Sequence, residues 1–428
     1  MSELTKKELR NLFIYQVFVR NHTSDGTFKA LINDLDRIKA LNVDVIYLLP
    51  IHPIGELNRK GSLGSPYSIK DFRKVNSELG TLEDYKLLIK EIHDRNMLIM
   101  MDIVFNHTSY DSILLKEHPE YFYKVDGEFK NRVGDWWDIT DFDYSHSADL
   151  STELINTLKY WTKLGVDSYR FDVASLLPME FLRKAKEEVL KLNPNTIFLS
   201  ESVHGSFIRY IRKMGFKALS ESEIFQVFDI AYDYDTHPSF ESYLKGDGTL
   251  KRYLEELIRQ EEVYPDNYIK MRNLENHDFG RIANFLNSDK TLINNWTSCM
   301  FFQKGSTMIY AAQEFSEVTH QTLFDKDPFK WTGKDISPLV TKLALITKTK
   351  IFSFGTYEIT VKNKDIFYAS YSYEGEIVVG IFNLSKCTGK VHVDLPEGQY
   401  LNLIDDKYYA VIGSMLKLSS KPLILKIK

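Results

Sequence analysis

Short runs of β-branched and aromatic residues alternate along most of the chain with longer amphipathic stretches. Between these runs, apolar residues recur three and four positions apart, as in residues 28–42, 81–96 and 153–165, which predicts helices with one buried face. Continuous apolar strands alternating with helices are typical of a parallel sheet covered on both faces. Eight such units predict a closed (β/α)8 barrel, the TIM barrel. The eight runs are LFIYQVFVR, VDVIYLLP, MLIMMDIVF, VDSYRFDV, TIFLSE, a less distinct one inside SESEIFQVFDI, YIKMRNL and STMIYAA.

Two segments depart from this alternation. Residues 107–146, after the third strand, are aromatic and irregular, where a loop of about two to six residues is usual; they predict a short inserted subdomain. From residue 351 the apolar residues alternate with period two and are separated by turns, which predicts an antiparallel β domain over residues 351–428. The barrel is therefore assigned to residues 1–106 and 147–350.

Charge and composition exclude several classes of partner. The chain has 54 Lys and Arg against 59 Asp and Glu and no basic block, so no nucleic-acid partner is expected. No stretch approaches the roughly 18 to 20 apolar residues that span a bilayer, so no membrane partner is expected. The N-terminal sequence MSELTKKELRNLFIYQ lacks the pattern of a secretory signal, which predicts a cytoplasmic location. Oligomeric state is not indicated.

Four polar segments close predicted strands: DIVFNH (102–107), GVDSYRFDVA (165–174), FLSES (198–202) and NHD (276–278). Charges placed at the end of an apolar strand are costly to bury without a partner. The carboxyl ends of barrel strands are, however, where active sites of this fold lie. The four segments together therefore predict an active site.

The residue types indicate sugar chemistry. Arg170 and Asp172 project from the same face of the fourth strand, so the cation favours an ionised Asp172 suited to act as a nucleophile. Glu201 closes the fifth strand and is a candidate acid/base, and Asp278 adds a third carboxylate. Two carboxyls with separated pKa values are the recurring equipment for cleaving glycosidic bonds. His107 and His277 supply hydrogen-bond donors for sugar hydroxyls.

Other interpretations remain open for these residues. Arg170 and Asp172 alone form a pattern also found in structural ion pairs, and a single histidine is more often structural than functional. A metal-dependent barrel hydrolase built from Asp102, His107, His277 and Asp278 is conceivable, although it leaves Arg170 and Glu201 unexplained. A carbohydrate-binding barrel without chemistry would be expected to lack one of the three carboxylates, and all three are present.

The four segments together resemble the signatures of the α-amylase family of glycoside hydrolases, family 13. The resemblance extends over nearly the whole chain and implies a barrel, an inserted domain and a C-terminal β-sandwich. It implies that Asp172 is the nucleophile, Glu201 the general acid/base and Asp278 the transition-state stabiliser. It further implies sugar-binding roles for the residues Tyr67 (in SPYSIKDF), His107, Arg170 and His277, and TDFDY (140–144) is similar to a further signature near the end of the inserted subdomain.

The expected activity is that of a retaining hydrolase of α-glucosidic bonds, α-1,4 bonds first, in maltooligosaccharides or related α-glucans. The alternative is a transglycosylase, isomerase or phosphorolytic enzyme of the same family with an α-glucoside donor. Val173, Ala174 and Ser175 follow the residue that the resemblance implies as nucleophile, where many α-amylases carry a Lys-His pair, so classical endo-acting starch hydrolysis is not expected.

No cofactor is expected to be required and no metal site is assigned, although bound calcium stays conceivable. Asn106 and Asp141 match positions that bind calcium in many α-amylases, but two oxygen ligands fall short of the roughly six to eight that calcium takes. Arg281, three residues after Asp278, is open to two interpretations: recognition of a non-reducing sugar end, or an ordinary structural arginine.

Overall fold

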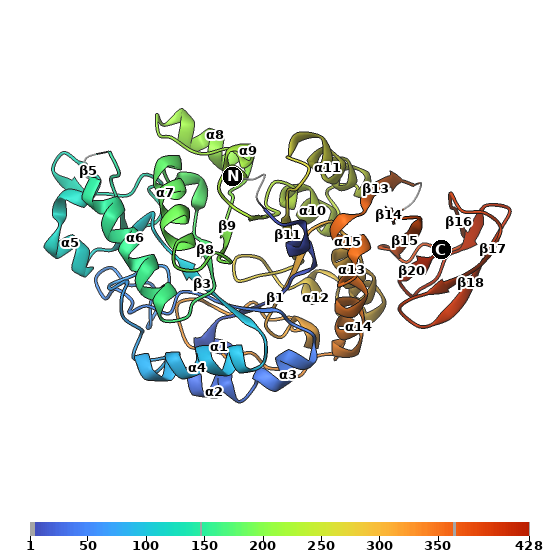
Figure 1. The fold of residues 1–428 in the computed structure, drawn as a ribbon, viewed down its shortest axis with the longest axis horizontal. Helices are drawn as coiled ribbons and strands as arrows, with labels where there is room; N and C mark the ends of the chain where they lie inside the picture. Colours follow the sequence, from blue (N-terminus) through green and yellow to red (C-terminus); the bar gives the residue numbers. More distant parts are fainter. Residues whose placement is uncertain (1–4, 146–147, 363–364, 428) are drawn as a thin grey trace.

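The computed structural model describes residues 5–145, 148–362 and 365–427. The domain ends predicted at residues 1, 146, 147 and 428 lie outside the described residues. Within the described part, eight parallel strands close into a barrel, which confirms the predicted (β/α)8 fold (Figure 1). The barrel strands are β1 (Phe13–Val17), β2 (Val45–Leu48), β3 (Leu98–Ile103), β8 (Ser168–Phe171), β9 (Ile197–Ser200), β10 (Ile230–Tyr232), β11 (Lys270–Arg272) and β12 (Ser306–Tyr310).

Strand β1 closes the barrel because it pairs in parallel with both β2 and β12. Alternate residues of the strands fill the interior with apolar side chains such as Ile14, Met100, Leu199 and Met271. The residues between them face outward, where most pack against the helices in a second, larger apolar cluster. The period-two alternation inside each strand therefore builds two cores, one within the barrel and one around it.

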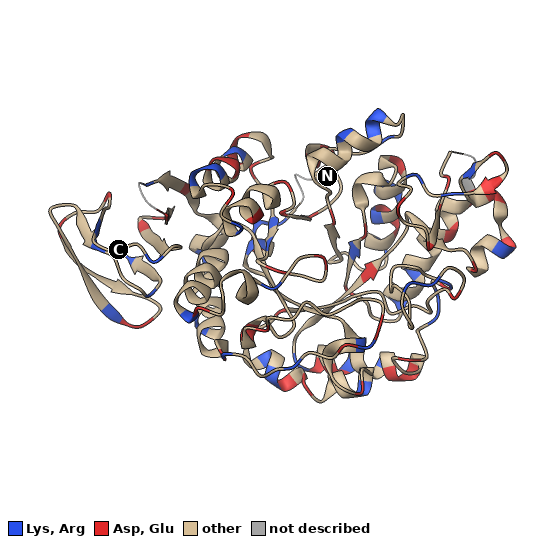
Figure 2. Cartoon of the chain, turned by 180° about the vertical axis from the view of Figure 1, so that it is seen from behind, with Lys and Arg blue, Asp and Glu red and all other residues tan. Residues whose placement is uncertain are grey.

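Helices cover the outside of the barrel. They are α1 (Val19–His22), α2 (Phe28–Ile32), α3 (Leu35–Ala40), α4 (Leu82–Asp94), α6 (Ala148–Lys163), α7 (Met179–Leu190), α8 (Gly205–Lys213), α9 (Glu221–Ile224), α10 (His237–Leu244), α11 (Leu250–Val263), α12 (Ile282–Phe285), α13 (Lys290–Phe302), α14 (Ser337–Thr347) and α15 (Lys350–Phe354). None of these described helices is long and apolar enough to cross a membrane. Acidic and basic residues are interspersed along the outer helices in the view of Figure 2.

Two elements differ from the sequence prediction. The single helix expected over residues 28–42 is divided into α2 and α3, because Asn33 caps α2 and the Asp34 carboxylate turns to accept hydrogen bonds from His22 and Arg37. The sixth strand was expected inside residues 220–230, yet that run begins with α9, which Ser220 and Glu223 start with a capping box. The strand itself begins only at Ile230.

The inserted segment after β3 forms its own small sheets. Strand β4 (His107–Ser109) pairs in antiparallel with β7 (Ile139–Asp141), and β5 (Lys124–Val125) pairs with β6 (Glu128–Phe129). Helix α5 (Ile113–Glu117) lies between β4 and β5 in the chain. Figure 1 places α5 and β5 at the opposite end of the long axis from the C-terminal strands.

The C-terminal part is an antiparallel β domain, as predicted. Its eight strands form one hydrogen-bonded order, β13-β14-β15-β20-β17-β18-β19-β16. Residues from both ends of that order, such as Tyr368 and Val391, share one apolar cluster, so the sheet bends over on itself. The strands are β13 (Thr356–Val361), β14 (Ile366–Tyr373), β15 (Glu376–Asn383), β16 (Lys390–His392), β17 (Gly398–Asn402), β18 (Lys407–Ile412), β19 (Met415–Lys417) and β20 (Leu423–Lys426).

A buried ionic network interrupts the apolar layer outside β11. The Lys270 ammonium is fully buried and pairs with Glu221 and, at 2.9 Å, with Asp235. Arg272 pairs with Asp233 at 2.7 Å. Burial raises the pKa of Glu221 to about 7; Lys270 opposes this rise and Asp235 adds to it. The network therefore holds one carboxyl that titrates near neutral pH.

We expect the network to make stability depend on pH through Glu221. Its pKa is higher in the folded chain than the value of roughly 4.3 expected in the unfolded chain, so its stabilising contribution is full below about pH 4 and is lost as pH rises through about 7. Relative to the Glu221→Gln variant, the unmodified protein should lose several degrees of Tm between pH 5.5 and pH 8. Thermal unfolding at both pH values measures this difference. Glu255→Gln, at an exposed i,i+4 pair, is the control, and a Tm difference between protein and variant that is the same at both pH values contradicts the prediction.

Candidate active site

The structure brings six of the seven predicted site residues together at the carboxyl ends of the barrel strands. Asp172 and Glu201 follow β8 and β9 directly, and His277 and Asp278 lie in the loop after β11. Tyr67, from the loop between β2 and α4, donates to Asp102 at 3.0 Å and stacks on the His277 ring with centroids 5.5 Å apart. The sequence prediction of one shared site at these strand ends therefore agrees with the geometry.

Arg170 is the sixth residue and contacts three carboxyl groups. Its Nη1 donates to Oδ1 of Asp102 and to Oδ1 of Asp172, both at 2.8 Å. Its Nη2 lies 3.0 Å from Oε2 of Glu201. The guanidinium is fully buried, so these charged contacts act where solvent screening is weak.

The electrostatics of Asp172 differ from the sequence expectation that Arg170 keeps this carboxyl ionised. Burial and the neighbouring Glu201 carboxylate raise the pKa of Asp172 well above its usual value, while Arg170 lowers it. Like charges at close range disfavour double ionisation, so Arg170 does not act on Asp172 alone: the neighbouring Glu201 carboxyl opposes it.

Glu201 is also held by a strained backbone amide that the sequence did not reveal. Val173 adopts φ 37° and ψ 45°, a left-handed conformation that is rare for a β-branched residue. In this conformation its N–H donates to Oε2 of Glu201 at 2.6 Å. Both of these contacts to Glu201 fall on Oε2, and neither involves Oε1. The residue after the candidate nucleophile thereby orients the candidate acid.

A hydrogen-bond chain fixes the proton on His277. The Tyr67 hydroxyl has one proton, which it donates to Asp102, so it accepts from Nε2–H of His277 at 2.6 Å. Nδ1 of His277 is then an acceptor, and Nε2 of Gln16 donates to it at 3.0 Å. Burial and Arg170 lower the pKa of His277 to about 3, which keeps the ring neutral. Gln16 was not among the predicted site residues; it lies on β1, which only β12 separates from β11, the strand before His277.

Asp278 is the most exposed of the candidate carboxylates. Its side chain is 37% exposed, against about 10% for Asp172 and Glu201. The Tyr234 hydroxyl donates to Oδ2 of Asp278 at 3.0 Å and accepts from Asn276 at 2.8 Å. The Tyr234 hydroxyl thus orients Asp278 through Oδ2, and the exposed part of the carboxylate remains accessible to a substrate.

His107 lies at the rim of this group, at the start of β4. Its Nδ1 is 3.1 Å from the Asn106 amide, and its ring centroid is 5.7 Å from that of Trp136. Burial lowers the pKa of His107 to about 3. The structure therefore places a neutral histidine near the site, and its sugar-binding role stays a prediction.

Arg281 does not face the site. Its side chain is fully buried, and it pairs with Glu275 at 2.6 Å and donates to Gln321 at 2.8 Å. Of the two interpretations of this residue, the structural one fits the geometry.

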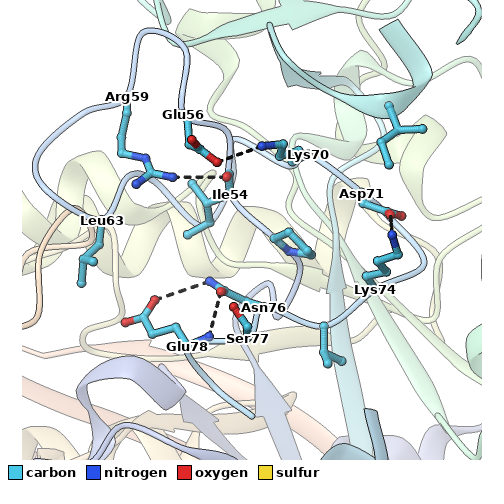
Figure 3. Close-up of a pocket in the computed structure, with 13 residues that line it drawn as sticks. Ile54, Glu56, Arg59, Leu63, Lys70, Asp71, Lys74, Asn76, Ser77 and Glu78 are labelled. Carbon is cyan, nitrogen blue, oxygen red and sulfur yellow. Dashed lines mark hydrogen bonds and ion pairs between the residues drawn. The ribbon is translucent and has the colours of Figure 1, made fainter. Parts of the chain in front are cut away.

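A separate pocket of about 670 Å³ opens in the loop between β2 and α4 (Figure 3). None of the predicted site residues lines it. Its charged side chains pair with one another or with neighbours, as in Lys70 with Glu56, Lys74 with Asp71 and Glu78 with Arg20. These pairs stabilise the loop that carries Tyr67.

Comparison with known proteins assigns the chain to a family. The family model described as the α-amylase catalytic domain matches residues 13–139 and 134–349, and the bacterial α-amylase C-terminal domain matches residues 358–425. These matches show a barrel enzyme of the carbohydrate-active kind. The chain belongs to the α-amylase family, which confirms the resemblance found in its sequence.

Solved structures agree with this assignment. The crystal structure of an α-amylase from Lactobacillus plantarum matches with a TM-score of 0.95 and 42% identity, over 98% of this chain and 100% of that one. The maltogenic α-amylase AmyB from Thermotoga neapolitana matches with a TM-score of 0.87 and 30% identity, over 98% and 99%.

Curated relatives carry a different name. An α-1,4-glucan:maltose-1-phosphate maltosyltransferase from Picrophilus torridus is 31% identical over 51% of this chain and 39% of its own length. The α-amylase MalA from Haloarcula japonica is 26% identical over 71% of this chain and 44% of its own. The chain thus spans about two fifths of the length of these relatives.

We expect the Gln16→Leu variant to lose the fixed tautomer of His277, because it removes the donor to Nδ1. In ¹⁵N NMR spectra of histidine-labelled protein, the unmodified protein should show one imidazole with an unprotonated Nδ1 and a protonated Nε2 across pH 5 to 8, and the variant should show mixed tautomers for that ring. Gln303→Leu, at a buried glutamine that donates to Tyr253, controls for general destabilisation. Identical spectra for Gln16→Leu and the unmodified protein contradict this role.

Proposed function

We propose that this protein cleaves α-glucosidic bonds, α-1,4 bonds first, in maltooligosaccharides or related α-glucans by a retaining mechanism. The observation that carries the proposal is the position of Arg170 between Asp102, Asp172 and Glu201 at the ends of three neighbouring strands. One guanidinium that holds two carboxyls at neighbouring strand ends matches the paired nucleophile and acid that such a reaction requires.

In the first step Asp172 is the nucleophile. Arg170 engages Oδ1, so Oδ2 attacks the anomeric carbon while the bond from that carbon to the leaving oxygen breaks. The leaving oxygen takes the proton from Oε1 of Glu201. The products are a glycosyl ester on Asp172, a shortened glucan with a new hydroxyl group, and an ionised Glu201.

In the second step Glu201 is the base. It removes a proton from water or from a sugar hydroxyl, and the resulting oxygen attacks the anomeric carbon. The ester bond breaks, Asp172 leaves as a carboxylate, and Glu201 is again protonated. Positive charge develops on the sugar ring in both transition states, and the Asp278 carboxylate, oriented by Tyr234, stabilises it electrostatically.

Transfer to a sugar is the second candidate, and one feature of the site favours it. Val173 and Val203, which follow the two reacting carboxyls, belong to an apolar cluster against which Trp136 and Phe207 pack. The Trp136 and Phe207 rings are stacked with centroids 6.3 Å apart. An apolar and aromatic surface beside the acid suits the apolar face of an acceptor sugar better than it suits ordered water. The maltosyltransferase name of several relatives points the same way.

The two reacting carboxyls should be separable by experiment. Asp172→Asn should lower kcat on maltoheptaose by roughly a thousandfold or more, and so should Glu201→Gln. With α-maltosyl fluoride, whose leaving group needs no proton, Glu201→Gln should still form the glycosyl ester, which mass spectrometry of the intact protein detects. Asp172→Asn should form none. Asp94→Asn, at an exposed pair with Lys90, is the control. Near-normal turnover by folded Asp172→Asn, shown by an unchanged circular dichroism spectrum, contradicts the assignment.

The products should reveal both the stereochemistry and the acceptor. In a ¹H NMR time course with maltoheptaose, the α-anomer of the new reducing end should appear before the β-anomer. Chromatography at high substrate concentration then separates the two candidate functions: only chains shorter than the substrate identify hydrolysis, and longer chains identify transfer. A β-anomer released first overturns the retaining mechanism, and an absence of products from all maltooligosaccharides overturns the proposed substrate class.

A further inference from the structure

The calcium ligands that the family resemblance suggested are engaged by an arginine in this chain. Asn106 follows β3 and Asp141 ends β7, and both side chains are buried, 4% and 1% exposed respectively. The Asp141 carboxylate accepts through Oδ2 from the backbone N–H of Arg132 at 2.9 Å and from its Nη1 at 3.2 Å. Oδ1 accepts from the Asn106 amide at 3.3 Å.

Arg132 is fixed by further contacts. Its Nη1 also donates to the carbonyl oxygen of Phe142 at 2.9 Å. Its guanidinium lies over the Tyr123 ring at 4.5 Å and near the Phe216 ring at 5.5 Å. The contacts with Tyr123 and Phe142 lie within the inserted segment, and the contact with Phe216 reaches the segment after α8. The guanidinium therefore joins the inserted segment to the loop region that follows Glu201.

This set of donors does not fit calcium. The ion takes roughly six to eight oxygen ligands, whereas here both oxygens of Asp141 accept N–H groups and Asn106 turns its amide hydrogen towards Asp141. The guanidinium beside the carboxylate would repel a second cation. Among the described residues, no three His, Cys, Asp or Glu side chains converge in a way that could hold a metal ion.

We propose that the guanidinium of Arg132 is the permanent structural cation of the inserted segment, and that the protein folds and holds His107 in place independently of calcium. The link to His107 is direct, because His107 and Asp141 are paired residues of β4 and β7. Neutralising Asp141 therefore stabilises the two-stranded sheet that positions His107. The positive charge belongs to the chain itself, so it does not dissociate.

Thermal unfolding tests the proposal without any assay of activity. The Tm of the unmodified protein should shift by less than about 1 °C when EDTA or millimolar calcium chloride is added. Arg132→Met leaves a buried carboxylate without its cation and should lower the Tm by roughly 5 °C at pH 8.

A double variant isolates the pair from general damage. Arg132→Met combined with Asp141→Asn removes both charges of the buried pair and should recover part of the Tm that Arg132→Met loses. Arg252→Met, which removes an exposed arginine paired with Glu256, should change the Tm little. If Arg132→Met does not fold, the Tm of the double variant with and without EDTA gives the same test of calcium dependence.

Three outcomes would overturn the proposal. They are a Tm of the unmodified protein that EDTA lowers by several degrees and calcium restores, an Arg132→Met variant as stable as the unmodified protein at pH 8, and a folded double variant whose Tm falls with EDTA.

Discussion

The buried guanidinium of Arg170 is the charge on which the mouth of the barrel depends. Asp102, Asp172 and Glu201 all lie within 3.0 Å of its nitrogens, and none of the three could remain ionised in this position without a partner. One cation cannot balance three carboxylates. Hydroxyl donors from Tyr47 and Tyr67 satisfy Asp102, while burial and the neighbouring Glu201 raise the pKa of Asp172. Burial and charge imbalance therefore act on the two carboxyls that the proposed reaction uses as nucleophile and acid.

The residues that flank Asp172 and Glu201 hold Glu201 in position at a cost in local stability. The backbone of Val173 adopts a strained left-handed conformation, in which its N–H donates to Glu201. The Ser202 hydroxyl, next in the chain after Glu201, donates to Glu221, which belongs to the buried ionic network around Lys270. Glu201 is therefore fixed from both sides, by the loop after Asp172 and by charges outside the barrel. Departures from local rules of this kind are expected where geometry is required for function.

The sequence predicted what depends on periodicity and on strand ends. The eight barrel strands follow from apolar runs, and six site residues meet because the carboxyl ends of parallel strands meet. What it could not predict depends on contacts between distant segments. Gln16 reaches His277 across 261 positions of sequence, and Arg281 turns inward because Glu275 and Gln321 engage it. The sixth strand was misplaced because three residues, Ile230–Tyr232, give too short a run to outweigh the helix signal before it.

The choice between water and a sugar as acceptor is made by residues outside the charged site. In the proposed mechanism both outcomes use Asp172, Glu201 and Asp278 in the same roles, so the family motifs do not distinguish hydrolysis from transfer. Relatives with this barrel accordingly carry the names of both amylases and maltosyltransferases. The side chains that can discriminate are those that contact the departing and arriving sugars. In this chain the candidates we propose are Val173, whose N–H binds Glu201, and the residues that share its apolar cluster, namely Val203, Trp136 and Phe207.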